Sequence, residues 1–218
     1  MPSPVGHLVA GVAIAWVAET VEAVRQNSRG TGGIPASSVV TPLVLACAAL
    51  ALAPDLDILL ASHRTFSHSL GAVVLAAAAC GAIAKARGAP GFATGLICGV
   101  AVGGHVLLDW LGRDSNTPRG VMALWPVSTA YFYSGIDLFA EVSRRYWKPD
   151  EFILGNAVSV ARELVILGPI AAGTYWMRRR NRPSDEANAS TSGSQAQAPG
   201  SSPEHRAPSP EPQTGPRP

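Results

Sequence analysis

Residues 39–69 read VVTPLVLACAALALAPDLDILLASHRTFSHS, and this stretch decides how the chain folds. Its first half is apolar and uncharged, and residues 39–60 are long enough to cross a bilayer, which takes roughly 20 residues. Its second half holds two Asp and two His residues. Such groups are costly at the mouth of a membrane helix unless a partner compensates them. The stretch therefore predicts a membrane helix that ends in a polar site.

The composition of the chain is that of a membrane protein. Of its 218 residues 47% are hydrophobic and only 15% are charged, whereas a soluble domain carries about a quarter charged residues. The formal net charge of +2 is too small to favour nucleic acid, so no nucleic-acid partner is expected. Each of the three cysteines lies in an apolar run, where we expect free, buried thiols.

Five apolar runs are predicted to be membrane helices, which makes the fold an all-α integral membrane helical bundle. They cover residues 1–19, 39–60, 68–84, 90–111 and 152–176. A polar connection is expected at residues 20–38, and Gly103 with Gly104 is expected to let two helices approach closely. Residues 1–176 are assigned to the membrane domain, and residues 177–218 to a basic juxtamembrane stretch and a disordered tail rich in Pro and Ser.

An Arg-rich cluster at residues 178–182 follows the last apolar run. By the positive-inside rule this cluster and the C-terminus are cytoplasmic. Counting back through five spans places seven polar residues together at the opposite, outer face of the membrane. They are His7, Asp55, Asp57, His63, His68, His105 and Asp109. Because the chain is poor in charge, this gathering at one face predicts a functional site.

The residue types in this group are ligands for a divalent metal ion, which binds anionic oxygen and neutral imidazole together. His105 and Asp109 are four positions apart, so on a helix they share one face. Asp55 and Asp57 suit a helix end, with one carboxylate on the metal and the other bridging or outside the ligand shell. Two ions roughly 3.5–4 Å apart can activate water against a phosphate ester.

Three residues are candidates for catalytic roles. Asp55 or Asp57 would orient the attacking water, and Arg64 could bind a phosphate in bidentate fashion. His63 and His68 are five positions apart, which suits a loop that folds back toward the metal. Because the site opens at the level of the lipid headgroups, the phosphoester of a lipid is the favoured substrate.

Each motif alone also has a simpler interpretation. A His-x-x-x-Asp pair on a helix is usually a hydrogen-bonded pair, and Pro-Asp-Leu-Asp is often a turn. Ser67 or Ser69 is better explained as a helix cap than as a nucleophile. Arg162 and Glu163 could form an internal ion pair, contact the site or serve as a relay.

Two other functions compete with hydrolysis. The chain could be a non-catalytic membrane protein, in which a structural metal or an ion-pair network fixes the helices and the tail recruits partners. It could also be a transporter, but transporters bind their cargo near the bilayer midplane between repeated halves, whereas these ligands gather at one mouth.

The motifs together resemble the YdjM-like family of bacterial membrane-bound, metal-dependent hydrolases. The matching pieces are Gly6-His7, Pro54-Asp55-Leu56-Asp57, the segment from His63 to Ser69, the segment from His105 to Asp109, and Leu124-Trp125-Pro126. The resemblance covers about residues 4–127. It implies a multi-pass protein of the cell inner membrane with its site on the periplasmic face.

That family is distantly similar to zinc-dependent phospholipase C and the fungal zinc nucleases. The similarity implies a divalent metal cofactor, zinc first, with manganese or iron as alternatives. It also implies that His7, Asp55 or Asp57, His63 or His68, His105 and Asp109 are ligands. The chain has no second His-and-Glu set after Asp109, which favours one or two ions over three. The expected partners are the lipid bilayer and a lipid substrate.

Overall fold

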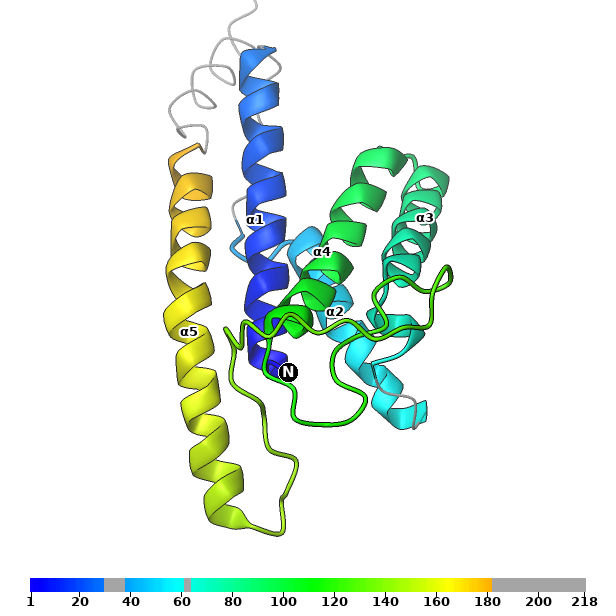
Figure 1. The fold of residues 1–218 in the computed structure, drawn as a ribbon. Helices are drawn as coiled ribbons and strands as arrows, with labels where there is room; N and C mark the ends of the chain where they lie inside the picture. The colour runs from blue at the N-terminus through cyan, green and yellow to red at the C-terminus, as the bar shows by residue number, and fades with distance from the viewer. Residues whose placement is uncertain (30–37, 61–63, 182–218) are drawn as a thin grey trace, which may run out of the picture. The chain divides into compact units, whose positions relative to one another are not determined.

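The computed structural model describes residues 1–29, 38–60 and 64–181, and the regular structure of these residues is helical (Figure 1). The α-helices are α1 (Pro4–Ser28), α2 (Pro42–Leu52), α3 (Leu70–Ala86), α4 (Gly91–Leu111) and α5 (Pro149–Arg180). Two 3₁₀ helices, η1 (Ala53–Leu60) and η2 (Phe66–His68), lie between α2 and α3. The all-α prediction is confirmed, and the predicted tail lies outside the described residues.

Four segments are long and apolar enough to cross a membrane by length and composition. They are Pro4–Ser28, Pro42–Leu59, Gly91–Leu111 and Phe152–Arg180. The fifth apolar helix, α3, has 17 residues, which at 1.5 Å per residue gives about 26 Å. These segments match the predicted bundle of about five membrane helices.

Three of the helices begin with a side-chain cap that the sequence encodes directly. Ser3 accepts a hydrogen bond from the Gly6 amide at α1, Thr41 caps α2, and Ser69 caps α3 by accepting from the Ala72 amide. A proline follows the cap at α1 and α2, where its missing N–H costs nothing. The expected capping role is thus confirmed for Ser69.

The first helix is longer than its apolar run. Residues 20–28 were expected in a polar connection, but α1 continues through them to Ser28. The Gln26 side chain donates to the Glu22 carboxylate at 2.9 Å, one turn earlier. Such i,i+4 pairs and good helix formers extend a helix into water without an apolar face.

The predicted second span changes its helix type partway along. The α-helix ends at Leu52, and the chain continues as the 3₁₀ helix η1. Pro54 explains the change, because it lacks the N–H that would bond to the preceding turn and its ring crowds that turn. The tighter winding sets the directions of Asp55 and Asp57 at the end of this span.

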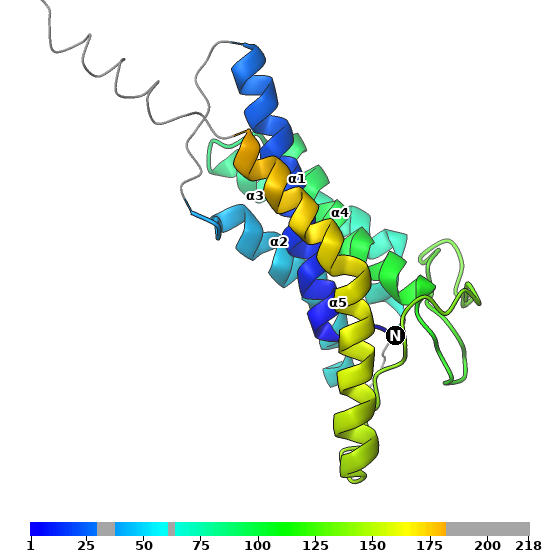
Figure 2. The same ribbon diagram turned by 90° about the vertical axis from the view of Figure 1, so that its left-hand side faces the viewer.

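Helices α1 and α5 run parallel and side by side, as both views show (Figures 1 and 2). The buried Glu163 carboxylate accepts hydrogen bonds from the Ser3 amide, at 2.6 Å, and from the Ser3 hydroxyl. At the other end Arg178 pairs with Glu19 at 2.5 Å. When successive helices cross a membrane in alternating directions, the first and the fifth must run in the same direction.

The adjacent Arg162 and Glu163 do not bond to each other. Glu163 contacts Ser3, whereas the Arg162 guanidinium donates to the Asp137 carbonyl at 2.9 Å. Neighbouring positions on a helix point about 100° apart, so the two side chains reach different partners. The interpretation of this dipeptide as an internal ion pair is therefore wrong.

The long connection from α4 to α5 crosses the end of the bundle where the N-terminus lies (Figure 1). It receives backbone hydrogen bonds from the start of α3: the Leu70 amide donates to the Ala123 carbonyl and the Gly71 amide to the Trp125 carbonyl, at 2.8 and 3.0 Å. The Met122 amide of the connection donates to the Arg64 carbonyl at 3.2 Å. The connection thus fixes the loop that precedes α3.

Helices α3 and α4 pack closely at Gly95, whereas Gly104 of the expected pair faces α1, where an added Cβ would lie 3.0 Å from Ile14 Cδ1. A Cβ at Gly95 would lie 2.5 Å from the Ala77 carbonyl oxygen, whereas one at Gly103 would have its nearest neighbour at 3.8 Å, on Val73. The close backbone approach of α3 and α4 is therefore more than two turns nearer the start of α4 than the glycine pair.

Substituting Gly95 with alanine is expected to destabilise the fold by about 1–3 kcal/mol, because the added methyl must push two backbones apart. Gly103→Ala is the matched control, since it brings the same gain in helix propensity without the clash. Thermal unfolding in detergent should show a lower Tm for Gly95→Ala only. Equal Tm values for the two variants would contradict the packing.

Candidate metal site

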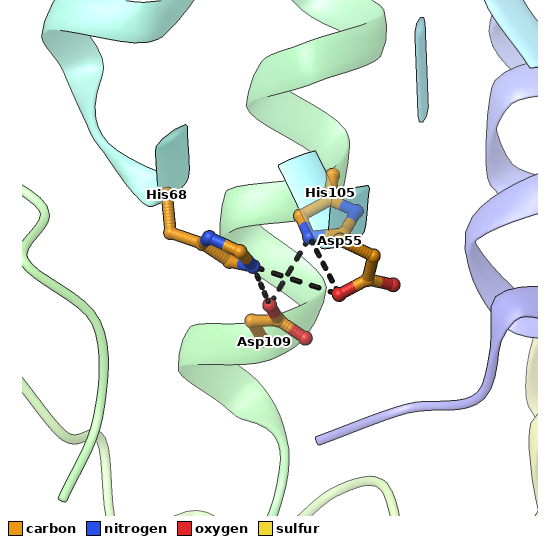
Figure 3. Close-up of side chains that lie close together, drawn as sticks. All are labelled: Asp55, His68, His105 and Asp109. Carbon is orange, nitrogen blue, oxygen red and sulfur yellow. Dashed lines mark ion pairs between the residues drawn. The ribbon is translucent and has the colours of Figure 1, made fainter. Parts of the chain in front are cut away.

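Four elements bring a cluster of His and Asp side chains together at one end of the bundle. The cluster comprises His7 of α1, Asp55 of η1, His68 of η2, and His105 and Asp109 of α4. Figure 3 shows four of them converging around one point, with Asp55 and Asp109 approaching from different elements. The predicted gathering of these residues is present in the structure.

The distances within the cluster suit a single tetrahedral ion. The Asp109 Oδ2 atom lies 3.1 Å from His68 Nε2 and 3.2 Å from His105 Nε2 (Figure 3). Asp55 Oδ1 lies 3.7 and 3.8 Å from the same two nitrogens. All four ligand atoms are within 4.8 Å of one another. Tetrahedral ligands with bonds of 2.0–2.1 Å are about 3.4 Å apart, which these separations bracket.

His7 is the fifth member of the cluster and contacts Asp109. Its Nε2 atom lies 3.3 Å from Asp109 Oδ1, and its ring stacks on the His105 ring with centroids 3.8 Å apart. Asp109 therefore directs its two oxygens at different imidazoles. A carboxylate placed in this way could bridge two bound ions.

Several polar atoms of the cluster are buried without a hydrogen-bond partner among the described residues. They are both ring nitrogens of His7, Nε2 of His105 and both carboxylate oxygens of Asp109. His7, His105 and Asp109 are at most 2% exposed. Apart from His7 Nδ1, these atoms meet one another as ion pairs at 3.2 and 3.3 Å, and buried charges are normally paired or bound to metal. The donor set of imidazole and carboxylate therefore fits a divalent cation.

A second layer of contacts points the imidazoles into the cluster. His105 Nδ1 lies 2.7 Å from the Ala51 carbonyl, so Nδ1 carries the proton and Nε2 is left as a ligand. His68 Nδ1 lies 3.2 Å from Asp57 Oδ2 and 3.0 Å from the Ser67 hydroxyl. Metal-bound histidines in proteins use such partners to fix their tautomer and orientation.

Asp57 therefore contacts the ring nitrogen of His68 that faces away from the cluster, which matches the second of the two roles considered for the Asp55–Asp57 pair. Asp57→Asn is expected to weaken metal binding by about 10- to 100-fold, the usual cost of removing an outer-shell carboxylate. A competition titration with a chelating dye measures the affinity. Complete loss of metal from the folded Asp57→Asn protein would instead make Asp57 a direct ligand.

The electrostatics of the cluster favour a cation. Burial lowers the pKa of His68, but its contacts with Asp109, Asp55 and Asp57 outweigh burial and raise that pKa to about 11. The three carboxylates thus favour the protonated, positively charged form of the His68 ring when no metal is bound. A metal ion would supply the same positive charge.

Arg64 is held by an acidic residue that sequence reasoning missed. Its guanidinium forms an ion pair with Asp114, which is 3% exposed and also accepts from the Gly120 amide at 2.7 Å. The Arg64 amide donates to Asp57 Oδ2 at 3.1 Å. Asp114 thereby braces the loop that carries His68, and nothing in its local sequence distinguishes it from other polar residues of the connection.

The structure thus unites five of the predicted ligands, with Asp57 beside them. His63 lies outside the described residues.

The family model described as YdjM inner membrane protein matches residues 1–180. No curated protein and no solved structure matches the chain. The match spans every described helix and all the residues of the cluster. Together with the apolar helices it makes this a multi-pass protein of the inner membrane, and the chain belongs to the YdjM inner membrane protein family.

Proposed function

We propose that this protein is a membrane-bound metal-dependent hydrolase that cleaves a phosphoester, with a lipid headgroup as its favoured substrate. One observation carries the proposal: ligand atoms of Asp55, His68, His105 and Asp109 all lie within 4.8 Å of one another, and the last three side chains are fully buried. Groups this costly to bury are typical of functional sites in membrane proteins.

His68, His105 and Asp109 form the inner ligand set of the proposal, because their atoms make the short contacts of 3.1 and 3.2 Å. Zinc suits this set best, and manganese or iron would also accept it. The bound ion would supply a Lewis acid that polarises a phosphoryl oxygen and activates water. His7 with Asp109 Oδ1 offers a position for a second ion.

Asp55 differs from the other members of the cluster in its exposure. Its side chain is 28% exposed, whereas those of His68, His105 and Asp109 are at 0%. It also makes the longest contacts, at 3.7 and 3.8 Å. Catalytic zinc sites keep three protein ligands and one open position. In the proposal Asp55 stands at this open position, where it orients the water and accepts its proton.

Arg64 is proposed to bind the phosphate of the substrate. The guanidinium has five N–H donors, and the Asp114 contact is made through Nη1. The remaining donors are available for a phosphate oxygen beside the cluster. Asp57 acts through His68 in this scheme, and also holds the Arg64 backbone.

The orientation in the membrane follows from charge. Arg178–Arg180 form the last turn of α5, and Arg178 meets Glu19, far along α1 from His7. With these arginines on the cytoplasmic side, the cluster faces the periplasm and reaches the headgroups of the outer leaflet. Residues 1–176 then form the membrane domain and residues 177–218 a cytoplasmic tail.

A structural metal is the second candidate function, and the geometry gives it a specific basis. If Asp55 binds the ion directly, four protein ligands close a tetrahedral site, as in structural zinc centres. The ion would then fix η1, η2 and α4 together without chemistry, and the tail would carry the function by binding partners.

Asp55→Asn separates the two functions. A hydrolase should retain its metal in this variant and lose about 10²- to 10⁴-fold in turnover, the usual contribution of a general base. A structural site should lose metal and stability together. The assay measures metal content, Tm and hydrolysis of bis(p-nitrophenyl) phosphate and of a fluorescent phospholipid in micelles. Unchanged turnover by metal-loaded Asp55→Asn protein would refute the catalytic role.

A further inference from the structure

A polar cavity lies beyond the end of α4, outside the metal cluster. Its volume is about 330 Å³. It is lined by Arg113, Ser115, Asp137, Ala140, Glu141 and Arg162. Arg113 follows Asp109 by four residues, and Arg162 precedes the Glu163 that holds the start of α1. The cavity therefore opens at the same end of the bundle as the metal cluster.

The two carboxylates of this cavity are bonded to neutral donors. Glu141 accepts hydrogen bonds from the Ser115 amide and hydroxyl at one oxygen and from the Asn116 side chain at the other. Asp137 accepts from the Tyr133 hydroxyl. Each carboxylate is thus stabilised without an arginine.

The two guanidinium groups, in contrast, have no carboxylate partner among the described residues. Arg162 donates through Nη2 to the Asp137 carbonyl at 2.9 Å and keeps its other donors. Arg113 uses its backbone, whose amide donates to the Phe139 carbonyl at 2.9 Å, and its side chain is exposed. The carboxylates of the cavity pair with neutral donors and not with these arginines, so the free guanidinium N–H groups can attract an added anion.

We propose that this cavity binds a phosphate group, held by the Arg113 and Arg162 side chains. Guanidinium groups match phosphate oxygens with paired N–H donors, which a chloride ion does not use. The cavity holds far more than one water, whose share of liquid volume is about 30 Å³. It therefore admits a phosphate together with the group attached to it. The phosphate comes from a lipid headgroup or from a soluble phosphate, which share this chemistry.

This inference goes beyond the proposed hydrolysis and uses none of the metal ligands. Arg113→Gln is the principal variant, because the hydrogen bonds that the structure shows for Arg113 are made by its backbone and remain in the variant. Arg119→Gln is the matched control: it removes the same charge from an exposed arginine of the same connection, outside the cavity. Arg162→Gln tests the second guanidinium.

The full-length protein is titrated with inorganic phosphate by calorimetry in detergent. Its retention of phosphatidylglycerol against phosphatidylcholine is measured by native mass spectrometry. Arg113→Gln and Arg162→Gln should each weaken binding of the phosphate group about tenfold, while Arg119→Gln should bind as wild type does. Metal content and Tm are measured for every variant, and we expect both to be unchanged in Arg113→Gln.

An effect of Arg113→Gln on both probes, or on one of them, supports the site. Loss for phosphatidylglycerol alone identifies a headgroup, and loss for inorganic phosphate alone identifies a soluble ligand. Binding that does not depend on Arg113, or that falls equally in Arg119→Gln, would overturn the proposal. If binding does not depend on Arg113 but the wild-type protein still holds metal and hydrolyses phosphoesters, the proposed function remains and only this phosphate site is refuted.

Discussion

Asp109→Asn is expected to lose metal. Its affinity for the ion should fall by more than about 100-fold, which is the largest loss usual for changing a residue that contacts only a ligand and not the metal. The Asp109 carboxylate contacts three imidazoles: Oδ1 faces His7, and Oδ2 faces His68 and His105. An asparagine keeps the shape but removes the anionic charge, and its NH₂ group would point at ring nitrogens that should bind a cation. Elemental analysis and a competition titration with zinc measure the loss.

Asp137→Asn is the control for this variant. It removes one carboxylate from the same end of the protein, at a position with a φ of 52° that asparagine tolerates. Its metal content should equal that of the wild type. If Asp109→Asn retains stoichiometric metal while folded, the cluster around Asp109 is a hydrogen-bonded network and not a metal site.

Removal of Arg64 should have the second large effect, a loss of about 3–5 kcal/mol in the free energy of unfolding. Arg64→Ala would leave the Asp114 carboxylate, whose side chain is 2% exposed, without its cation. Asp114→Ala should lower the free energy of unfolding by a similar amount, because it leaves the Arg64 guanidinium without its anion. The amide of residue 64 still donates to Asp57 in Arg64→Ala, so the expected loss comes from the unpaired Asp114 carboxylate and not from this backbone contact.

The double variant Arg64→Met/Asp114→Leu tests whether the cost arises from the unpaired charge. Replacing both partners of a buried ion pair with apolar residues is often nearly neutral, so this variant should recover most of the lost stability. Unfolding in detergent measures all three proteins. Single variants within about 0.5 kcal/mol of the wild type would show that the pair is solvent-screened, as surface pairs are.

Much of the fold follows from the sequence because the bilayer constrains it strongly. Apolar runs of this length cross a membrane as helices, because a helix bonds all its backbone groups within the segment, and the described helices lie where those runs lie. The convergence of His7, His68 and Asp109 follows from counting spans, since alternate helix ends lie on the same side. The shared face of His105 and Asp109 follows from their spacing of four.

The parts that sequence reasoning missed depend on contacts between distant residues. Arg64 and Asp114 are 50 positions apart, and Ser3 and Glu163 are 160 apart, so no local pattern links them. The different roles of Asp55 and Asp57 depend on the 3₁₀ winding of η1. That winding turns Asp57 toward His68 Nδ1 and leaves Asp55 partly exposed.

The sequence also does not show which neighbouring helix each glycine of α4 meets. Gly95 and the Gly103–Gly104 pair all lie in α4, but only at Gly95 would a Cβ meet the backbone of α3 within 2.5 Å. A glycine shows that a close approach is allowed. Which glycine is used depends on where the neighbouring helix crosses, and this is a property of the whole bundle.

The metal content of the purified wild-type protein tests the central claim most directly. The protein is extracted in a mild detergent, loaded with zinc or manganese, freed of excess ion and analysed by elemental analysis, with its helix content checked by circular dichroism. The cluster of His7, Asp55, His68, His105 and Asp109 predicts one to two bound ions per chain. A well-folded protein that binds no ion after loading would contradict the metal site and the hydrolase built on it.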